Sequence, residues 1–505
     1  MNPRYFISSL LKLSERRKSV ATARGMASTP QSRHGIVALL ACCVLIPWLA
    51  GCDGSGPPAK FSTSPRTEEL MSPARKHVQK ELTDHFGTPQ DLVAWLRFPI
   101  QYGQVQGKIK SVESSEAGAY KFIVDWPDQK IEDINFRQGV GVLMTGGEYA
   151  GQSVKLNHFD SKTGQINIDV LMNPAPAVGD ELTVIGHQLQ SGRMVYMEHC
   201  VHCHGTSGDG NGPTAKYLNP RPRDYRPGIF KFTSTKQPEK VTTTDLKRIV
   251  KQGIPGTYMP SFMLLKDGEL TAVVEYVRWL SIRGEMEKKM VDELYGDYST
   301  TALRERKESG ESEADVAKEF DELLKGDFAE TVDGFATELS DAWSAAEVDD
   351  ALIVPSLPRI EDSPESRDRG RKLFLSAKTK CVTCHGATGR GNGSATEDFW
   401  PIPGTQPPVN YAQRGLHDSW GNKLKPRDLT RGIYRGGRRP VDLYRRIYAG
   451  IKGTPMPAAG GTALKDDEIW DLVNYVLSIP FQTDRTIAEP LEVAPPEQAT
   501  AATGQ

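Results

Sequence analysis

Two short motifs in this chain place a pair of thiols and an imidazole next to one another. "CVHCH" runs from Cys200 to His204 and "CVTCH" from Cys381 to His385. In each motif two residues separate the thiols and a histidine follows at once, which is the spacing used to attach c-type haem. Two thiols one helical turn apart can add to the two vinyl groups along one porphyrin edge, and the adjacent histidine can then reach the iron. We therefore expect two covalently bound haems c, with His204 and His385 as iron ligands. The thiols expected to form thioether bonds are Cys200, Cys203, Cys381 and Cys384.

Cysteine and histidine can also build two other kinds of site. A zinc site would need further Cys or His ligands at regular spacing, and His199 and His202 could supply them in the first motif. The second motif, "KCVTCHG", lacks both residues. A thioredoxin-like redox pair lies in a βαβ context and needs no histidine after it. Repetition of the complete CxxCH motif favours haem, and His199 and His202 are then expected at the surface near the haem edge.

Each motif opens one of two homologous segments, which make an internal repeat. A helical pattern precedes each motif, and a glycine-rich loop follows it, "HGTSGDGNG" in the first segment and "HGATGRGNG" in the second. Next, "PRDYRPGIF" from Pro222 matches "PRDLTRGIY" from Pro426, and an amphipathic helical pattern follows. Six residues after the glycine that ends this pattern stands a methionine, Met259 in "GIPGTYMP" and Met456 in "GIKGTPMP".

This order of elements resembles class I cytochrome c over about residues 190–283 and 365–481. The resemblance implies two all-α domains, in each of which the first helix crosses the last through a contact between a glycine and an aromatic residue. The residues that fit these places are Gly192 with Tyr276 and Gly370 with Tyr475.

A loop methionine completes the iron coordination in that family, and Met259 and Met456 fit this role. They occupy equivalent positions in the repeat, and each precedes a proline that stiffens the loop. Met263 is the rival at the first haem. Met456 is the only methionine after Met290, so His417 is the main rival at the second.

Other residues of the repeat could support the haems. The family often has a proline after the glycine-rich loop, and its carbonyl orients the proximal histidine. Pro213 fits this place in the first segment, whereas Ser394 stands there in the second. Arg223 and Arg427, in the repeated "PRD", could bind a haem propionate, because a guanidinium group suits a carboxylate. The alternative is a local ion pair with the aspartate that follows each arginine.

The second segment carries two further features. An insertion over 394–425 is rich in proline and aromatic residues, and it could be an ordered lid over a haem edge or a plain surface loop. From Arg414 to Lys452 there are eleven basic residues against three aspartates. This run could dock an acidic partner beside the second haem, or it could be an ordinary solvated face.

The N-terminus reads as an export signal rather than as part of the fold. A basic, serine-rich start precedes the apolar run Gly35–Cys52, which is too short for an ordinary spanning helix and fits a signal h-region. The run ends in "LAGC", which resembles the lipobox of bacterial lipoproteins and implies lipidation of Cys52. An uncleaved transmembrane anchor is the alternative, and Met26 could be the true start. Both readings export the protein and tether it to a membrane, so we expect it on the periplasmic side, held by a lipid anchor.

The rest of the chain shows ordinary hydrophobic content and a formal net charge of −2 over 505 residues, and neither points to nucleic acid. Short alternating runs predict strands in one region, and apolar residues three and four apart predict amphipathic helices in another. We expect an export signal over 1–52, a tether with a short helix over 53–97, a small all-β domain over 98–188, a first cytochrome c domain over 189–283, a charged helical insert over 284–350, a second cytochrome c domain over 351–482 and a disordered tail over 483–505.

The resemblance implies a dihaem cytochrome c. An iron with both axial positions filled by protein suits one-electron transfer, and Met/His ligation raises its potential. Such a protein would carry electrons between redox partners, for example a terminal oxidase or a quinol-oxidising complex, or serve as a subunit of a larger oxidoreductase. A dihaem peroxidase is the main alternative, but it must open one iron, and the repeated methionine argues against that. A structural lipoprotein would not need two complete haem units.

Overall fold

The computed structural model describes residues 60–114, 120–128, 136, 139–168, 172 and 174–482. The predicted export signal with Cys52, and the predicted disordered tail after residue 482, lie outside these residues. Among the described residues, no helix combines the length and apolar character needed to span a bilayer.

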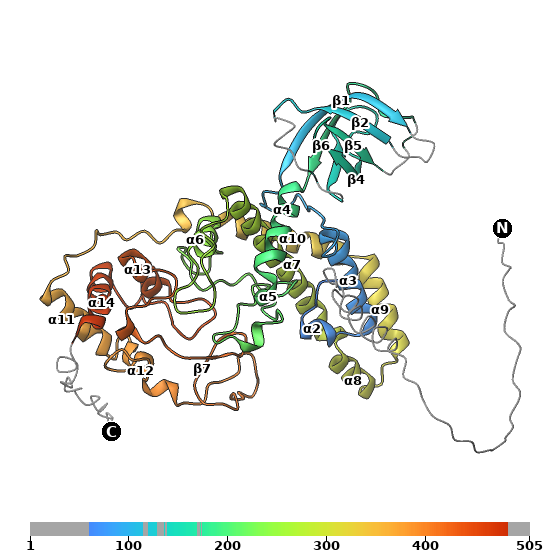
Figure 1. The fold of residues 1–505 in the computed structure, drawn as a ribbon. Helices are drawn as coiled ribbons and strands as arrows, with labels where there is room; N and C mark the ends of the chain where they lie inside the picture. The colour runs from blue at the N-terminus through green and yellow to red at the C-terminus, as the bar shows by residue number, and fades with distance from the viewer. Residues whose placement is uncertain are drawn as a thin grey trace, which may run out of the picture. The chain divides into compact units, whose positions relative to one another are not determined.

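The expected all-β domain is a closed antiparallel barrel with the strand order β1-β2-β5-β4-β3-β6 (Figure 1). Its strands are β1 (Gln104–Ser114), β2 (Tyr120–Asp125), β3 (Gly141–Met144), β4 (Ser153–Asp160), β5 (Gln165–Ile168) and β6 (Glu181–Ile185). Buried and exposed residues alternate along the strands, so that one face of the sheet points into the barrel. Along β2, for example, Tyr120, Phe122 and Val124 are buried, whereas Lys121 and Asp125 are exposed. The inward side chains fill a core of the barrel's own, and closure leaves no unpaired sheet edge.

The first haem domain rests on the crossing of α4 (His187–His199) with α7 (Asp267–Tyr298) (Figure 1). A side chain added at Gly192 would overlap the carbonyl oxygen of Ala272 and lie 2.9 Å from Cβ of Tyr276. The glycine therefore allows two backbones to touch, as the repeat predicted. The remaining helices of this domain are α5 (Val201–His204), η2 (Ala215–Tyr217) and α6 (Thr243–Gln252).

The second haem domain repeats this plan, with α11 (Pro364–Leu375) crossing α14 (Asp466–Ser478). A side chain at Gly370 would overlap the carbonyl oxygen of Asp471 and lie 2.8 Å from Cβ of Tyr475. Its other elements are α12 (Cys381–His385), η4 (Ser394–Thr396), β7 (Leu416–His417), β8 (Lys423–Leu424), η5 (Leu429–Arg431), α13 (Pro440–Ala449) and η6 (Ile479–Phe481).

The last helix of the first haem domain is longer than the sequence indicated. The boundary predicted after residue 283 falls inside α7, which continues to Tyr298 and buries Met286, Met290 and Leu294 in its second half. These residues pack in one core with a helix that precedes the barrel and with the predicted insert. The helices that supply this core are α3 (Ser72–Phe86), α8 (Thr300–Glu308), α9 (Glu313–Lys325) and α10 (Phe328–Ala345). The short helix α2 (Pro65–Glu68) contacts α7, and η3 (Asp349–Ala351) follows α10. The insert is thus an extension of the first haem domain.

Buried acids of α7 hold these flanking segments. Glu287 accepts hydrogen bonds from the Ser64 backbone N–H and the Thr67 hydroxyl, both at 2.6 Å. Glu285 accepts the indole N–H of Trp343 at 2.7 Å. Buried carboxylates need such partners, so the contacts fix both the start of the described chain and α10 against α7.

Candidate haem sites

Each CxxCH motif forms a single helical turn, α5 in the first domain and α12 in the second, with its thiols free. Burial raises the pKa of the Cys200 thiol to about 12 and also raises the pKa of Cys381. Redox-active and metal-binding cysteines usually have a depressed pKa, because the thiolate is the reactive form. The surroundings of these thiols therefore fit a neutral thioether better than a thiolate ligand or a dithiol pair.

The two motif histidines are buried and held in the same way. Nδ1 of His204 lies 3.2 Å from the carbonyl oxygen of Arg223, and Nδ1 of His385 lies 3.2 Å from that of Arg427. A carbonyl can only accept a hydrogen bond, so Nδ1 carries the proton and Nε2 keeps its lone pair. Burial lowers the pKa of both imidazoles, although the carbonyl bond acts in the opposite direction. Each ring is thus a neutral ligand with its second nitrogen already oriented.

The source of the orienting carbonyl corrects the sequence prediction. Pro213 and its counterpart Ser394 were expected to supply it, but Arg223 and Arg427 do. The glycine-rich loop curls back on itself, and Gly210, at φ +70°, lies so close to Pro222 that an added Cβ would be 2.7 Å from its carbonyl oxygen. This approach brings the "PRD" segment beneath the histidine ring.

The two predicted ligand methionines lie in loops of the same conformation. Met259 N–H donates to the Thr257 hydroxyl at 3.1 Å, and Met456 N–H donates to that of Thr454 at 3.3 Å. In each loop the methionine carbonyl accepts an N–H from five residues earlier, Ile254 or Ile451, at 3.1 Å. Both methionines are half-buried.

The rival ligands are placed differently. The side chain of Met263 is 65% exposed. His417 is buried in the β7–β8 hairpin, where its ring stacks on Tyr411 with 4.0 Å between centroids and Nδ1 lies 2.8 Å from the Gly415 carbonyl. Neither residue takes part in the repeated loop that carries Met259 and Met456.

The side chains of Arg223 and Arg427 do not form the local Arg–Asp pairs that were considered. Asp224 binds Arg226 at 2.8 Å instead, and Asp428 binds Arg431 at 3.3 Å. Arg223 lies over the Trp420 ring at 3.5 Å and 4.0 Å from Asp418. Trp420 and Asp418 belong to the insertion, which is therefore ordered and reaches across to the first haem domain.

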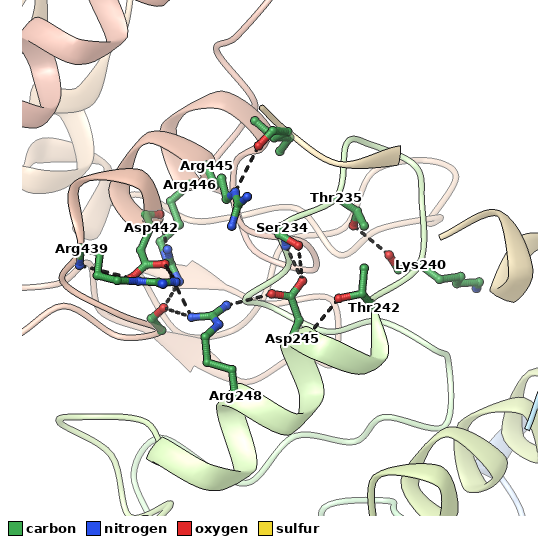
Figure 2. A network of polar contacts seen from close by, with 12 residues as sticks. Ser234, Thr235, Lys240, Thr242, Asp245, Arg248, Arg439, Asp442, Arg445 and Arg446 are labelled. Atoms are coloured by element: carbon green, nitrogen blue, oxygen red, sulfur yellow. Dashed lines mark hydrogen bonds and ion pairs between the residues drawn. The ribbon is translucent and has the colours of Figure 1, made fainter. Parts of the chain in front are cut away.

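Part of the basic run of the second domain contacts the first domain. Arg446 stacks on Phe232 at 5.1 Å, and Lys452 donates to Thr235 at 3.2 Å. Other members bind within the second domain: Arg445 donates to the Ile353 carbonyl at 3.1 Å, and Arg439 donates to Asp442 at 2.9 Å (Figure 2). The side chains of Arg431 and Arg439 are 71% and 61% exposed, so the prediction of a docking surface concerns only the exposed part of the run.

Figure 2 shows Arg248 of α6 between the aspartates of the two domains. It lies 3.0 Å from Asp245 in its own domain and 3.7 Å from Asp442 in the other, and it donates to the Gly436 carbonyl at 2.9 Å. A cavity of about 390 Å³ lies at the same junction and is lined by both domains, including Ile229 and Met456. The two haem domains therefore share a built interface that includes one of the methionine loops.

A zinc site finds no support among the residues that the structure describes, because nowhere in them do three or more Cys, His, Asp or Glu side chains gather in a group that could hold a metal ion. The residues present instead fit haem at both motifs: two thiols within one helical turn, an imidazole whose Nε2 keeps its lone pair, and a methionine loop.

Comparison with known proteins gives two family matches. Residues 187–277 match the family of cytochrome c oxidase, cbb3-type, subunit III, and residues 368–480 match the cytochrome c family. No curated protein matches the chain. A chain of the Kuenenia stuttgartiensis reducing HAO-like protein complex Kustc0457/Kustc0458 is similar at 25% identity, over 57% of this chain and 96% of that chain, with a TM-score of 0.39. A TM-score this low supports no conclusion about the arrangement or partners of this chain. The two family matches, one on each CxxCH motif, show a dihaem c-type cytochrome with two covalently bound haems c.

Proposed function

We propose that this dihaem cytochrome is a membrane-anchored carrier of single electrons between redox proteins on the outer side of a bacterial cytoplasmic membrane. The observation that carries the proposal is the equivalence of the two sites. Each has a histidine held by a carbonyl at 3.2 Å and a methionine loop closed by the same hydrogen bonds.

The proposed iron ligands are His204 with Met259 and His385 with Met456. Covalent haem held in this way changes between the ferrous and ferric states by one electron. With both axial positions filled by the protein, neither iron offers a substrate an open site, and Met/His ligation suits electron transfer rather than catalysis.

The proposed anchor is Cys52, at the end of "LAGC". Lipid chains hold a protein by burying methylene groups at ~0.8 kcal/mol each, and lasting attachment needs more than one chain. The described fold begins at Lys60, eight residues after this cysteine. A Cys52→Ser variant should be recovered in the soluble exported fraction with both haems, whereas the wild-type chain should remain with the membranes.

A carrier and a dihaem peroxidase can be separated by spectroscopy. In the oxidised protein both haems should show low-spin spectra and contribute to the near-infrared Met–Fe band, and peroxide should change neither. A dihaem peroxidase would instead oxidise a reduced donor when peroxide is added. On activation, one of its two haems would also lose its contribution to the near-infrared Met–Fe band.

A subunit of a larger oxidoreductase is the second candidate. The first domain matches a family named for a subunit of cytochrome c oxidase. Gentle solubilisation of membranes followed by haem staining of native gels distinguishes the two: a free carrier migrates near its own mass, and a subunit migrates with a complex.

A further inference from the structure

The two haem domains meet through equivalent parts of the repeat. Phe232 and Gly436 occupy the same position, ten residues after the proline of "PRD", and they touch: a Cβ added to Gly436 would lie 2.6 Å from the Phe232 ring. Asp245 and Asp442 are likewise equivalent, and Arg248 joins them. Equivalent residues that meet one another define a local pseudo-twofold axis. A contact made by one domain can therefore have a counterpart made by the other.

Arg427 contacts the ligand elements of both haem sites. Its carbonyl oxygen accepts Nδ1–H of His385 in its own domain at 3.2 Å. Its guanidinium group lies against Gly256 of the other domain, where an added Cβ would be 2.6 Å from Nη2. Gly256 stands three residues before Met259, and its carbonyl also accepts Arg435 at 3.4 Å. The loop that carries Met259 is thus held by arginines of the second domain.

Arg223 makes the counterpart contact through one aromatic ring. Its carbonyl holds His204, and its guanidinium group stacks on Trp420 at 3.5 Å. The Trp420 ring lies against Gly453 so closely that an added Cβ would overlap the ring. Gly453 stands three residues before Met456. The insertion that supplies Trp420 therefore completes the second half of a reciprocal arrangement.

We propose that Arg427 and Arg223 are positioning residues that couple the two haem sites, each joining the proximal histidine of its own domain to the methionine loop of the other. The inference rests on the methionine ligation proposed above. Because Gly256 and Gly453 have no side chain, the Arg427 guanidinium group and the Trp420 ring pack directly on the backbone of the methionine loops. A movement of the histidine segment in one domain therefore displaces the methionine loop of the other. With haem bound, a change at one site would thus reach the other through the chain itself, without a partner protein.

The charge of Arg427 predicts the direction of its effect. A cation beside the Met259 loop disfavours the more positive ferric iron and so raises the potential of the first haem. Arg427→Ala retains the carbonyl that orients His385 and removes the guanidinium group, which reaches Gly256 of the other domain and also donates to the Ile433 carbonyl at 2.8 Å. It should therefore lower the potential of the first haem, although the residue belongs to the second domain.

The test assigns each signal to one haem. In a Met456→Ala background the remaining near-infrared Met–Fe band belongs to the Met259 site, and in a Met259→Ala background it belongs to the Met456 site. Adding Arg427→Ala should shift or weaken the band in the first background, lower that haem's midpoint potential, and leave the band in the second background unchanged. Arg427→Lys, which restores the charge, should recover part of the potential.

The control is Arg431→Ala, in the same segment, whose side chain is 71% exposed and pairs with Asp428 on the surface. It should change neither haem. An effect of Arg427→Ala confined to the Met456 site, or an equal effect of Arg431→Ala, would overturn the coupling.

If neither Met259→Ala nor Met456→Ala weakens the near-infrared band, the proposed methionine ligation is wrong. This outcome differs from a failure of the coupling, in which both methionine variants weaken the band but Arg427→Ala does not affect the Met259 site. A double variant could lose its haem. In that case the Arg427→Ala single variant is measured by NMR, where each ligand methionine gives a hyperfine-shifted methyl signal. The two single methionine variants assign these signals, and only the signal of Met259 should shift.

Discussion

The imidazole of His385 and the backbone carbonyl of Arg427 lie 3.2 Å apart, joined by a hydrogen bond that spans 42 residues of sequence. The same bond joins His204 to Arg223 across 19 residues. Because the carbonyl fixes the proton on Nδ1, each ring presents Nε2 as its ligand atom. The acceptor is a backbone carbonyl, which every residue type carries, so substitution of the arginine side chain leaves the acceptor group in place.

The two haems should be separable by mutation of their thiols. Replacing Cys381 and Cys384 with Ala should leave one covalent haem per chain, because the first site has its own thiols, histidine and core. Mass spectrometry of the intact chain measures this directly. Two haems on the variant, or one on the wild type, would contradict the assignment.

The helix crossing of the first domain should tolerate no side chain at Gly192. Gly192→Ala places a methyl group against the Ala272 backbone, and overpacking of this kind costs about 1–3 kcal/mol. Denaturant unfolding of the haem-loaded protein measures the loss. Gly296→Ala, also in a helix but with nothing within 4 Å of the added methyl group, is the matched control. It should raise the free energy of unfolding by about 0.5–1 kcal/mol, and equal losses at both sites would refute the argument.

The interface between the haem domains should depend on Arg248. Arg248→Ala leaves the buried Asp245 and the Gly436 carbonyl without one donor each. It also removes the ion pair with Asp442. These losses should lower the free energy of unfolding by about 1–3 kcal/mol. The variant should also split a single unfolding transition into two if the interface couples the domains. Arg438→Ala removes an exposed charge from the same basic run and should change stability by no more than about 0.5 kcal/mol.

Acid should loosen the packing of α3 against the extension of the first domain. His77 contacts the rings of Phe320 and Phe328, with centroids 6.4 and 5.2 Å away. Burial lowers its pKa below 6.5, against the opposing effect of Glu81. The unfolded chain therefore takes up the proton first, so this contribution to stability is complete above pH 6.5 and declines as the pH falls through the lower folded value.

His77→Phe removes this titration. The free energy of unfolding, measured above and below pH 6.5, should fall less steeply with acid in the variant than in the wild type. His85→Phe is a fair comparison, since His85 lies on the same helix but is more exposed. An unchanged acid dependence in His77→Phe would assign the loss to other groups.

Local repetition explains what the sequence predicted well. The thiol spacing, the glycine at each helix crossing and the position of each methionine are short patterns that occur twice. The structure confirms the two glycine crossings and gives both methionine loops the same conformation. Alternating residues predicted the strands of the barrel for the same reason, because burial on one face leaves a period of two.

Contacts between distant segments explain what was missed. The orienting carbonyl belongs to Arg223 rather than Pro213, since backbone atoms carry no signal in a sequence. Nothing in the sequence indicated that Arg446 and Lys452 of the basic run contact the first domain, because their partners Phe232 and Thr235 lie some two hundred residues away. The first domain extends past residue 283 because buried Met286 and Met290 continue the apolar face of a helix whose partners precede and follow it. The aromatic content of the insertion was the one available sign that Trp420 packs on another part of the chain.

The contact between Phe232 and Gly436 also bears on whether each haem domain could pair with a copy of itself. Two identical domains about a twofold axis would place phenylalanine against phenylalanine, or glycine against glycine, at this point. Here one domain supplies the side chain and the other supplies the space that receives it. We therefore expect the two domains, produced as separate fragments, to bind one another in preference to a second copy of themselves.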